Sequence, residues 1–478
     1  MRNGGKSMAV MAKFRQDRWM RRLLKVGKWL LAIVIFLVAA AAGWLYQSPP
    51  ELIKVGSAYS AKIICSNVVL AGRDARQVLE VDVQAPGHPL LKLMDFNVDR
   101  EKRTITTGLF GIFGKGMAVA RPGFGCTTVP DGKLDAVLPV PQLDPPPVLS
   151  DAPWPEGATV QPSQDPAIAA ILADDKLAGP GMRAIVVVKN GRIVAERYGE
   201  GFSADTPLLG WSMTKSVNAA IIGTLVKAGK LSLDSKALLD PWKADRRKDI
   251  SLADLMAMSS GLEFNEDYGD VTDVTRMLYL EPDMAGFAAA KPLAHDIGTT
   301  FNYSSGTANI ISRIWQDAAG PEALIWSKKA LFDPIGMTSA TLEPDARGTF
   351  VGSSYLYATA RDWARFGLLI LNKGVWNGQE VLPAGFADWM HEEASGSKGQ
   401  YGKGQVWLYG PEGDTPAGQD PDAGFGLPDD TFWFEGHDGQ STSVIPSKGL
   451  VVVRMGLTPF ALHYKPQGLV AALAKALE

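Results

Sequence analysis

An uninterrupted apolar run near the N-terminus constrains this chain more than any other feature of its sequence. Residues Trp29–Tyr46 are apolar throughout, and no charged residue occurs from Trp29 to Pro50. A helix of this length just spans the hydrocarbon core of a bilayer. The preceding residues 1–28 hold nine Lys or Arg and one acid, which favours a cytoplasmic location for this segment. The sequence therefore predicts a single-pass anchor over residues 29–47.

A cleaved signal peptide is the alternative for the same run. Ala40–Ala42 offers a small-residue cleavage site before Gly43. In both cases the chain after about residue 47 is exported, and we expect it on the periplasmic side of a bacterial inner membrane.

The charge of the exported part limits its partners. Beyond residue 28 the chain holds 39 basic and 50 acidic residues. Such an acidic body disfavours nucleic acid, which needs a basic surface. The five histidines form no H-x-H or H-E-x-x-H motif, and no dinucleotide-binding or P-loop glycine pattern occurs. We therefore expect no metal or other cofactor. The sequence makes no prediction of the oligomeric state.

Residues 48–138 are predicted to form a small β-rich accessory domain. Three short runs have strand composition: Ala61–Ile64, Val78–Val83 and Arg103–Thr107. The chain's two cysteines, Cys65 and Cys126, both lie in this segment, and an oxidising compartment favours one disulfide between them. Two buried thiols are the alternative.

A proline-rich segment separates this part from the main body. Residues 139–166 contain nine prolines, which favour either an extended linker or a strap along the surface. In the body, 167–478, strand-like runs flank Asn190-Gly191, a strong hairpin signal. A second hairpin pattern, Ser441–Pro446 with Leu450–Gly456, lies near the C-terminus. We expect an α+β fold in which both ends of the body build one antiparallel sheet, flanked by helices and joined to a helical subdomain.

The spacing Ser-x-x-Lys occurs twice, and only one copy has a context suited to catalysis. Ser395 and Lys398 lie in a polar Gly/Ser-rich stretch typical of an exposed loop. Ser212 and Lys215 instead open the apolar helical run Val217–Val226. A helix N-terminus favours an alkoxide at the serine, and burial lowers the pKa of a lysine until it can act as a base. The alternative is a simple helix cap beside a solvated lysine.

Two later motifs favour the catalytic interpretation. In Tyr303-Ser304-Ser305, a tyrosine beside the lysine can relay the proton to the leaving group, and Ser305 can join the same network. In His437-Asp438-Gly439-Gln440, Gly439 would let the strand edge approach the substrate. The backbone N–H of Gln440 could then pair with that of Ser212 as an oxyanion hole.

The ordered motifs Ser212-x-x-Lys215, Tyr303-x-Ser305 and His437-x-Gly439 resemble those of the serine β-lactamase and penicillin-binding-protein superfamily. Within it, the chain is most similar to the class C β-lactamase-like branch, which includes 6-aminohexanoate-dimer hydrolase and related esterases. Supporting stretches are Trp211–Ser216, Met258–Tyr268, Leu331–Met337 and Tyr357–Leu368. The resemblance covers roughly residues 180–460. It implies Ser212 as the acylated nucleophile, Lys215 as the base and Tyr303 as the catalytic tyrosine.

Two departures from the β-lactamase pattern narrow the expected substrate. Ser305 replaces an asparagine, and His437 replaces a lysine that meets the substrate carboxylate. Histidine is a weaker anion ligand because it is mostly uncharged near pH 7. We therefore expect hydrolysis of an ester or small amide. The alternatives are a D,D-peptidase or β-lactamase, and an inactive envelope-binding homologue. Trp211 and Tyr268 are expected to line the acyl pocket, with Tyr355 facing it.

Overall fold

A computed structural model describes residues 4–416 and 418–478, so the first three residues of the basic segment 1–28 lie outside the described residues. A five-stranded antiparallel sheet forms the centre of the body, in the order β12-β13-β14-β5-β6. These strands are Phe432–Gly436, Gln440–Ile445, Leu450–Gly456, Met182–Lys189 and Arg192–Tyr198. β14 pairs with β5, so both ends of the body share one sheet, and the predicted architecture is confirmed.

Both faces of this sheet are buried, which explains the continuous apolar runs in its strands. On β5, Val186 and Val188 pack into the core that contains α6 and α11, whereas Ile185 and Val187 pack into the core that contains α4 and α13. The bounds are Pro166–Ala173 for α4, Met213–Lys227 for α6, Ala360–Leu371 for α11 and Gln467–Ala476 for α13. Asn190 and Gly191, with φ of 48° and 80°, form the predicted β5–β6 turn.

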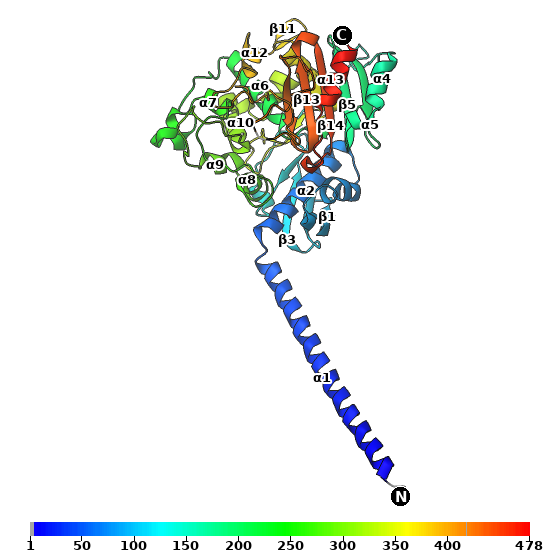
Figure 1. Ribbon diagram of the computed structural model, residues 1–478. Helices are drawn as coiled ribbons and strands as arrows, with labels where there is room; N and C mark the ends of the chain where they lie inside the picture. The colour runs from blue at the N-terminus through cyan, green and yellow to red at the C-terminus, as the bar shows by residue number, and fades with distance from the viewer. Residues whose placement is uncertain (1–3, 417) are drawn as a thin grey trace.

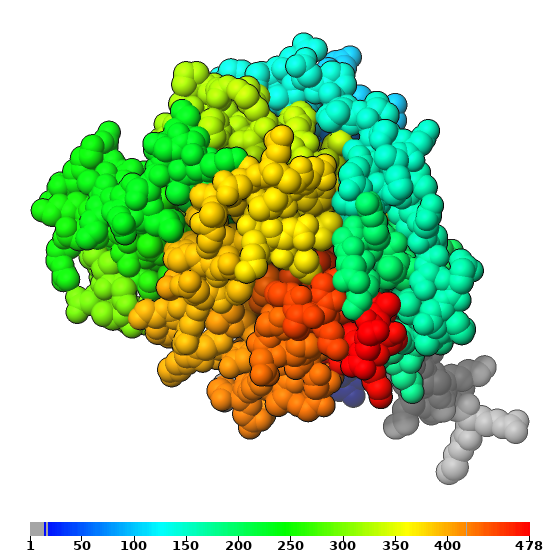
Figure 2. All heavy atoms as spheres, turned by 90° about the horizontal axis from the view of Figure 1, so that it is seen from above, coloured from blue at the N-terminus to red at the C-terminus, as the bar shows by residue number. Residues whose placement is uncertain are grey.

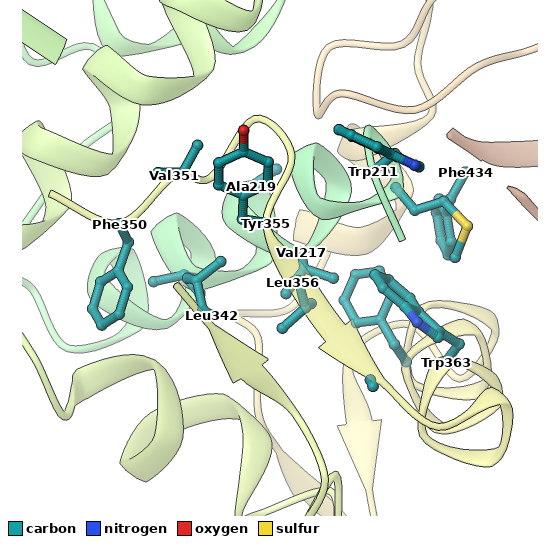
Figure 3. Close-up of a cluster of buried hydrophobic side chains, with 14 of the residues drawn as sticks. Trp211, Val217, Ala219, Leu342, Phe350, Val351, Tyr355, Leu356, Trp363 and Phe434 are labelled. Carbon is teal, nitrogen blue, oxygen red and sulfur yellow. The ribbon is translucent and has the colours of Figure 1, made fainter. Parts of the chain in front are cut away.

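The chain between β6 and β12 forms the helices and short strands that make up the rest of the body (Figure 1). The helical part contains α7 (Leu252–Met256), α8 (Asp273–Leu280), α9 (Met284–Ala289), α10 (Ser305–Ala319) and α12 (Phe386–Met390). A three-stranded sheet, β7-β9-β8, consists of Leu208–Leu209, Leu356–Ala358 and Thr341–Leu342. It packs into the main core beside α6 (Figure 3). Gly210 alone separates the end of β7 from Trp211 and Ser212.

The N-terminal part begins with α1, Gly4–Gln47, which projects from the body in Figure 1. Within the described residues, α1 is the one helix long and apolar enough to cross a membrane. α2 (Glu51–Ala71) follows and packs on a four-stranded antiparallel sheet, β1 to β4. These strands are Met94–Asp99, Thr104–Leu109, Phe113–Ala120 and Cys126–Thr128. A Cβ on Gly116 would lie 2.3 Å from the backbone of Ala58, so glycine allows this close approach.

Two strand predictions in this part are wrong. Ala61–Ile64 lies inside α2, and Val78–Val83 spans α3 (Ala75–Val78) and the helical turn after it, Leu79–Gln84. Both runs are rich in β-branched residues, but α2 is buried on nearly every side and its packing outweighs that preference. The third run falls on β2, and the predicted disulfide joins Cys65 to Cys126.

A buried ion pair fixes α2 to the body. The Lys62 ammonium contacts Glu343, which also accepts hydrogen bonds from Ser66 Oγ at 2.8 Å and from the Cys126 N–H at 2.6 Å. Burial raises the pKa of Glu343 and lowers that of Lys62, while each charge opposes the shift of the other. Around this ion pair, apolar residues of α2 and of the body pack together in one continuous hydrophobic core.

The proline-rich residues 139–165 have irregular backbone, with bends and turns at 151–158, and lie against the body, as Figure 2 shows for the cyan-to-green segment. The buried Arg365 side chain donates hydrogen bonds to the carbonyls of Pro155, at 3.2 Å, and Gly157, at 2.8 Å. Arg121 on the accessory side donates to the carbonyl of Leu138. Of the two predicted arrangements, the segment adopts the strap.

Removing one partner of the buried ion pair tests how firmly α2 is fixed. Lys62→Met leaves the Glu343 carboxylate buried without its counter-ion, and we expect a loss of about 3–5 kcal/mol in the free energy of unfolding. Urea denaturation in detergent would measure it. Arg76→Met is the matched control, because it removes the exposed pair with Asp95 and should cost about 1 kcal/mol or less. Equal effects of the two substitutions would contradict this view of the interface.

Candidate active site

The two residues of the first Ser-x-x-Lys copy lie side by side at the start of α6. Ser212 occupies the N-cap position, yet its hydroxyl makes no capping hydrogen bond to the helix. Instead, Lys215 Nζ donates to Ser212 Oγ at 2.9 Å. Lys215 is 1% exposed, so it is not a solvated surface lysine. The simple-cap alternative does not describe this pair.

The ammonium of Lys215 is held by neutral oxygens. It donates to Ser305 Oγ at 3.1 Å and to the carbonyl of Ser353 at 3.0 Å. Burial lowers the pKa of Lys215 to about 8, although the negative charge of Glu266 favours the protonated form. A substantial fraction of this lysine is therefore neutral slightly above pH 7, as a general base requires.

Tyr303 completes the cluster from the loop before α10. Its ring lies 4.7 Å from Lys215 Nζ and packs against Trp407, with ring centroids 5.2 Å apart. Burial and the charge of Glu266 raise the pKa of Tyr303, while a hydrogen bond with Ser212 acts in the opposite direction. The phenol consequently keeps its proton, which suits a group that donates to a leaving group.

Glu266 is a member of this network that the sequence analysis did not single out. Its carboxylate accepts hydrogen bonds from the N–H of Ser305 at 2.8 Å, from the hydroxyl of Ser305, and from Tyr268 at 3.3 Å. Burial raises the pKa of Glu266, and Lys215 opposes that shift. Its position could have indicated a role in the site, because Glu266 lies in the family-like stretch Met258–Tyr268, two residues before Tyr268.

The third motif forms a tight turn between β12 and β13. The buried side chain of Gln440 closes it, donating to the carbonyls of His437 and Asp438 at 3.2 Å and bonding both backbone groups of Gly456. Gly439 has φ of 77°, so its role here is to permit the turn. A Cβ on Gly436, the last residue of β12, would lie 2.2 Å from the Gly210 carbonyl, so glycine allows this close backbone approach. The Gln440 turn thus lies against the backbone just before Ser212.

Aromatic rings form the wall next to this turn. His437 stacks on Tyr268 at 5.4 Å and meets the edge of Trp211 at 5.7 Å. Trp211 and Tyr268 both line a cavity at this wall. Tyr355 is not part of that lining, contrary to expectation: it is 1% exposed and packs behind Trp211. Lys62 Nζ lies 4.1 Å from the centroid of its ring. Figure 3 shows Trp211 and Tyr355 in this buried cluster.

The second Ser-x-x-Lys copy is an exposed turn. Ser395 and Lys398 are both exposed, and Lys398 has φ of 56°. Across residues 4–416 and 418–478, no group of three or more His, Cys, Asp or Glu side chains is placed to hold a metal ion.

Comparison with known proteins fits this geometry. The Beta-lactamase family model matches residues 170–458, which include all three motifs. The chain belongs to the Beta-lactamase family. Its fold and family identify it as a hydrolase related to the serine β-lactamases and penicillin-binding proteins.

Individual relatives of this Beta-lactamase family chain are distant. The 6-aminohexanoate-dimer hydrolase of Paenarthrobacter ureafaciens is 25% identical over 228 residues, which is 43% of this chain and 56% of that protein. A Bacillus anthracis structure provisionally named as a 6-aminohexanoate-dimer hydrolase has a TM-score of 0.51 and 23% identity, covering 64% of this chain and 81% of its own. A Bacteroides dorei structure provisionally named as a β-lactamase has a TM-score of 0.51 and 22% identity, covering 66% and 99%. These structures share the fold of the body.

Glu266→Gln tests the electrostatics of the cluster. Without the neighbouring negative charge the ammonium of Lys215 is less stabilised, so the pKa of Lys215 should fall below about 8. If Lys215 is the base, the rate at which a fluorophosphonate labels the protein, measured against pH, should then reach half its maximum at lower pH than in the unmodified protein. A reduced rate with an unmoved midpoint would assign Glu266 a packing role only.

Proposed function

We propose that this chain is a membrane-anchored serine hydrolase that acts through an acyl-enzyme on an ester or a small linear amide. The observation that carries the proposal is the buried hydrogen bond from Lys215 Nζ to Ser212 Oγ, together with the lowered pKa of Lys215. A nucleophile and its base within hydrogen-bond distance, with the base oriented by further groups, meet the requirement for covalent catalysis.

In the proposed acylation, neutral Lys215 takes the proton of Ser212 while Oγ attacks the substrate carbonyl carbon. The developing oxyanion accepts hydrogen bonds from the backbone N–H groups of Ser212 and Gln440. The tetrahedral intermediate collapses as the bond to the leaving group breaks. Tyr303 donates a proton to the departing oxygen or nitrogen and recovers one from the Lys215 ammonium.

Deacylation reverses the proton transfers. Water attacks the ester carbon of the acyl-enzyme, its proton passes to the Tyr303–Lys215 pair, and Ser212 leaves with a proton restored to Oγ. Ser305 and Glu266 do not touch the reacting atoms in this scheme. They position the ammonium of Lys215 and adjust its pKa.

The wall at His437 supports a substrate without a carboxylate at that position. His437 stands where β-lactamases carry a lysine, and its ring is held between Tyr268 and Trp211. These aromatic neighbours favour contact of His437 with apolar or neutral substrate groups over binding of an anion. The Paenarthrobacter relative is named as a 6-aminohexanoate-dimer hydrolase, which supports the amide part of the proposed substrate class.

Hydrolysis of a β-lactam or a cell-wall peptide is the second candidate. The family match favours it, as does the proposed exported location. For the location, we propose that α1 anchors the chain with the body on the periplasmic side, because its residues 18–47 suit a membrane span and the basic residues precede it.

Ser212→Ala tests the nucleophile directly. The variant has no hydroxyl to acylate, so fluorophosphonate labelling should disappear and p-nitrophenyl acetate hydrolysis should fall at least about a thousandfold. Ser395→Ala, in the exposed second copy of the motif, is the matched control and should behave like the unmodified protein. Labelling that survives in Ser212→Ala would place the nucleophile elsewhere.

A three-substrate comparison tests the substrate class. We expect hydrolysis of a p-nitrophenyl ester and 6-aminohexanoate dimer to exceed that of a chromogenic cephalosporin, because His437 replaces the anion-binding lysine. Turnover of each by the purified full chain in detergent provides the measurement. Fast cephalosporin turnover with the ester and the dimer untouched would support the second candidate instead.

A further inference from the structure

We propose that a cavity between α2 and the active-site wall binds the apolar acyl portion of the substrate; this inference rests on the proposed function. The cavity, which we call the α2 cavity, has a volume of about 390 Å³. Its accessory side includes Leu52, Val55, Tyr59 and Leu90, and its hydrolase side includes Trp211 and Tyr268. The Beta-lactamase family match begins at residue 170, so the accessory side lies outside the family domain.

The α2 cavity adjoins the nucleophile through Trp211. This residue directly precedes Ser212 and has φ of 47°, a strained conformation for a bulky side chain. The strained backbone holds the indole in the cavity wall, beside His437, while the next residue presents its hydroxyl to Lys215. In this proposal the acyl chain runs along Trp211, from the α2 cavity to the neighbouring Ser212.

The accessory side of the α2 cavity is held in place by buried contacts. Tyr59 meets the edge of Tyr279 from α8, with ring centroids 5.7 Å apart. One turn further along α2, Lys62 pairs with Glu343 and lies against Tyr355, which packs behind Trp211. Both walls are thus joined through the core, and the cavity is a built feature of the fold.

The position of Tyr303 assigns this cavity to the acyl group. Tyr303 packs on Trp407, which lines a second cavity of about 310 Å³ on the other side of His437. Since Tyr303 is the proposed donor to the leaving group, the leaving group belongs on that side. The second cavity also has Glu412 and Asp438 in its lining, so it suits a polar group.

The lining of the α2 cavity selects an apolar chain. Leucine, valine and aromatic side chains dominate it, while His88, Asp270, Thr275 and His437 are its polar members. The volume falls in the range of small-molecule sites, on the order of 300–1,000 Å³. Leu52 also lies a few residues after the end of α1, so an amphiphilic substrate held at the membrane surface would have a short path to it.

A chain-length series tests the proposal on the full chain in detergent. Across p-nitrophenyl acetate, butyrate, hexanoate and octanoate, kcat/KM should rise up to roughly fourfold per added methylene until the cavity is filled. Leu90→Trp should reduce the octanoate-to-acetate ratio of kcat/KM at least tenfold, because the larger ring occupies the cavity. Leu93→Trp, in the same helical turn but 45% exposed and outside the lining, should keep the original ratio.

The outcomes separate this inference from the proposed function. A protein that is labelled at Ser212 and hydrolyses acetate, but shows no rise with chain length or no change of ratio in Leu90→Trp, overturns the acyl cavity alone. Absence of any labelling at Ser212 overturns the proposed function as well. If Leu90→Trp does not fold and is therefore not labelled, Leu52→Trp, which also changes the lining, is used instead. A tenfold lower octanoate-to-acetate ratio supports the acyl cavity, and an unchanged ratio overturns it.

Discussion

The burial of Lys215 is the constraint on which the rest of the proposed site depends. A charged lysine in the interior is unfavourable unless its protons find acceptors, and here three oxygens provide them: Ser212 Oγ, Ser305 Oγ and the Ser353 carbonyl. Two of the three are neutral hydroxyls rather than carboxylates. The site therefore holds the ammonium without stabilising it strongly, and its pKa falls to about 8. Glu266 is linked to Lys215 through Ser305, and its negative charge limits how far the pKa of Lys215 falls.

The second constraint is that the accessory part forms one wall of the α2 cavity. The sequence predicted residues 48–138 as a separate small domain, whereas α2 shares a continuous core with the body. The Lys62–Glu343 pair, the hydrogen bond from the Cys126 N–H to Glu343 and the strap at residues 139–165 connect the two parts. One wall of the α2 cavity consequently comes from residues shortly after α1, so the proposed acyl selection depends on a segment outside the family domain.

Local chemistry explains which features could be predicted from the sequence. The Asn190-Gly191 turn and the continuous apolar run of β5 are local features of the sequence, so the central sheet was predictable, although β12 was missed. The position of Ser212 at a helix start was predictable for the same reason. The helical state of Ala61–Ile64, the burial of Tyr355 and the contact of Glu266 with Ser305 depend on residues distant in the chain. Strand propensity and motif spacing carry no information about such contacts.

The most direct test of this account is the pH dependence of acylation in the unmodified protein. Rapid mixing with p-nitrophenyl acetate gives the rate of the first p-nitrophenol release between pH 6 and 10. Because neutral Lys215 is the proposed base, that rate should rise with pH, reach half its maximum near pH 8 and then level off. A midpoint near 10, as for a solvated lysine, or a rate independent of pH would contradict the central role of the buried lysine.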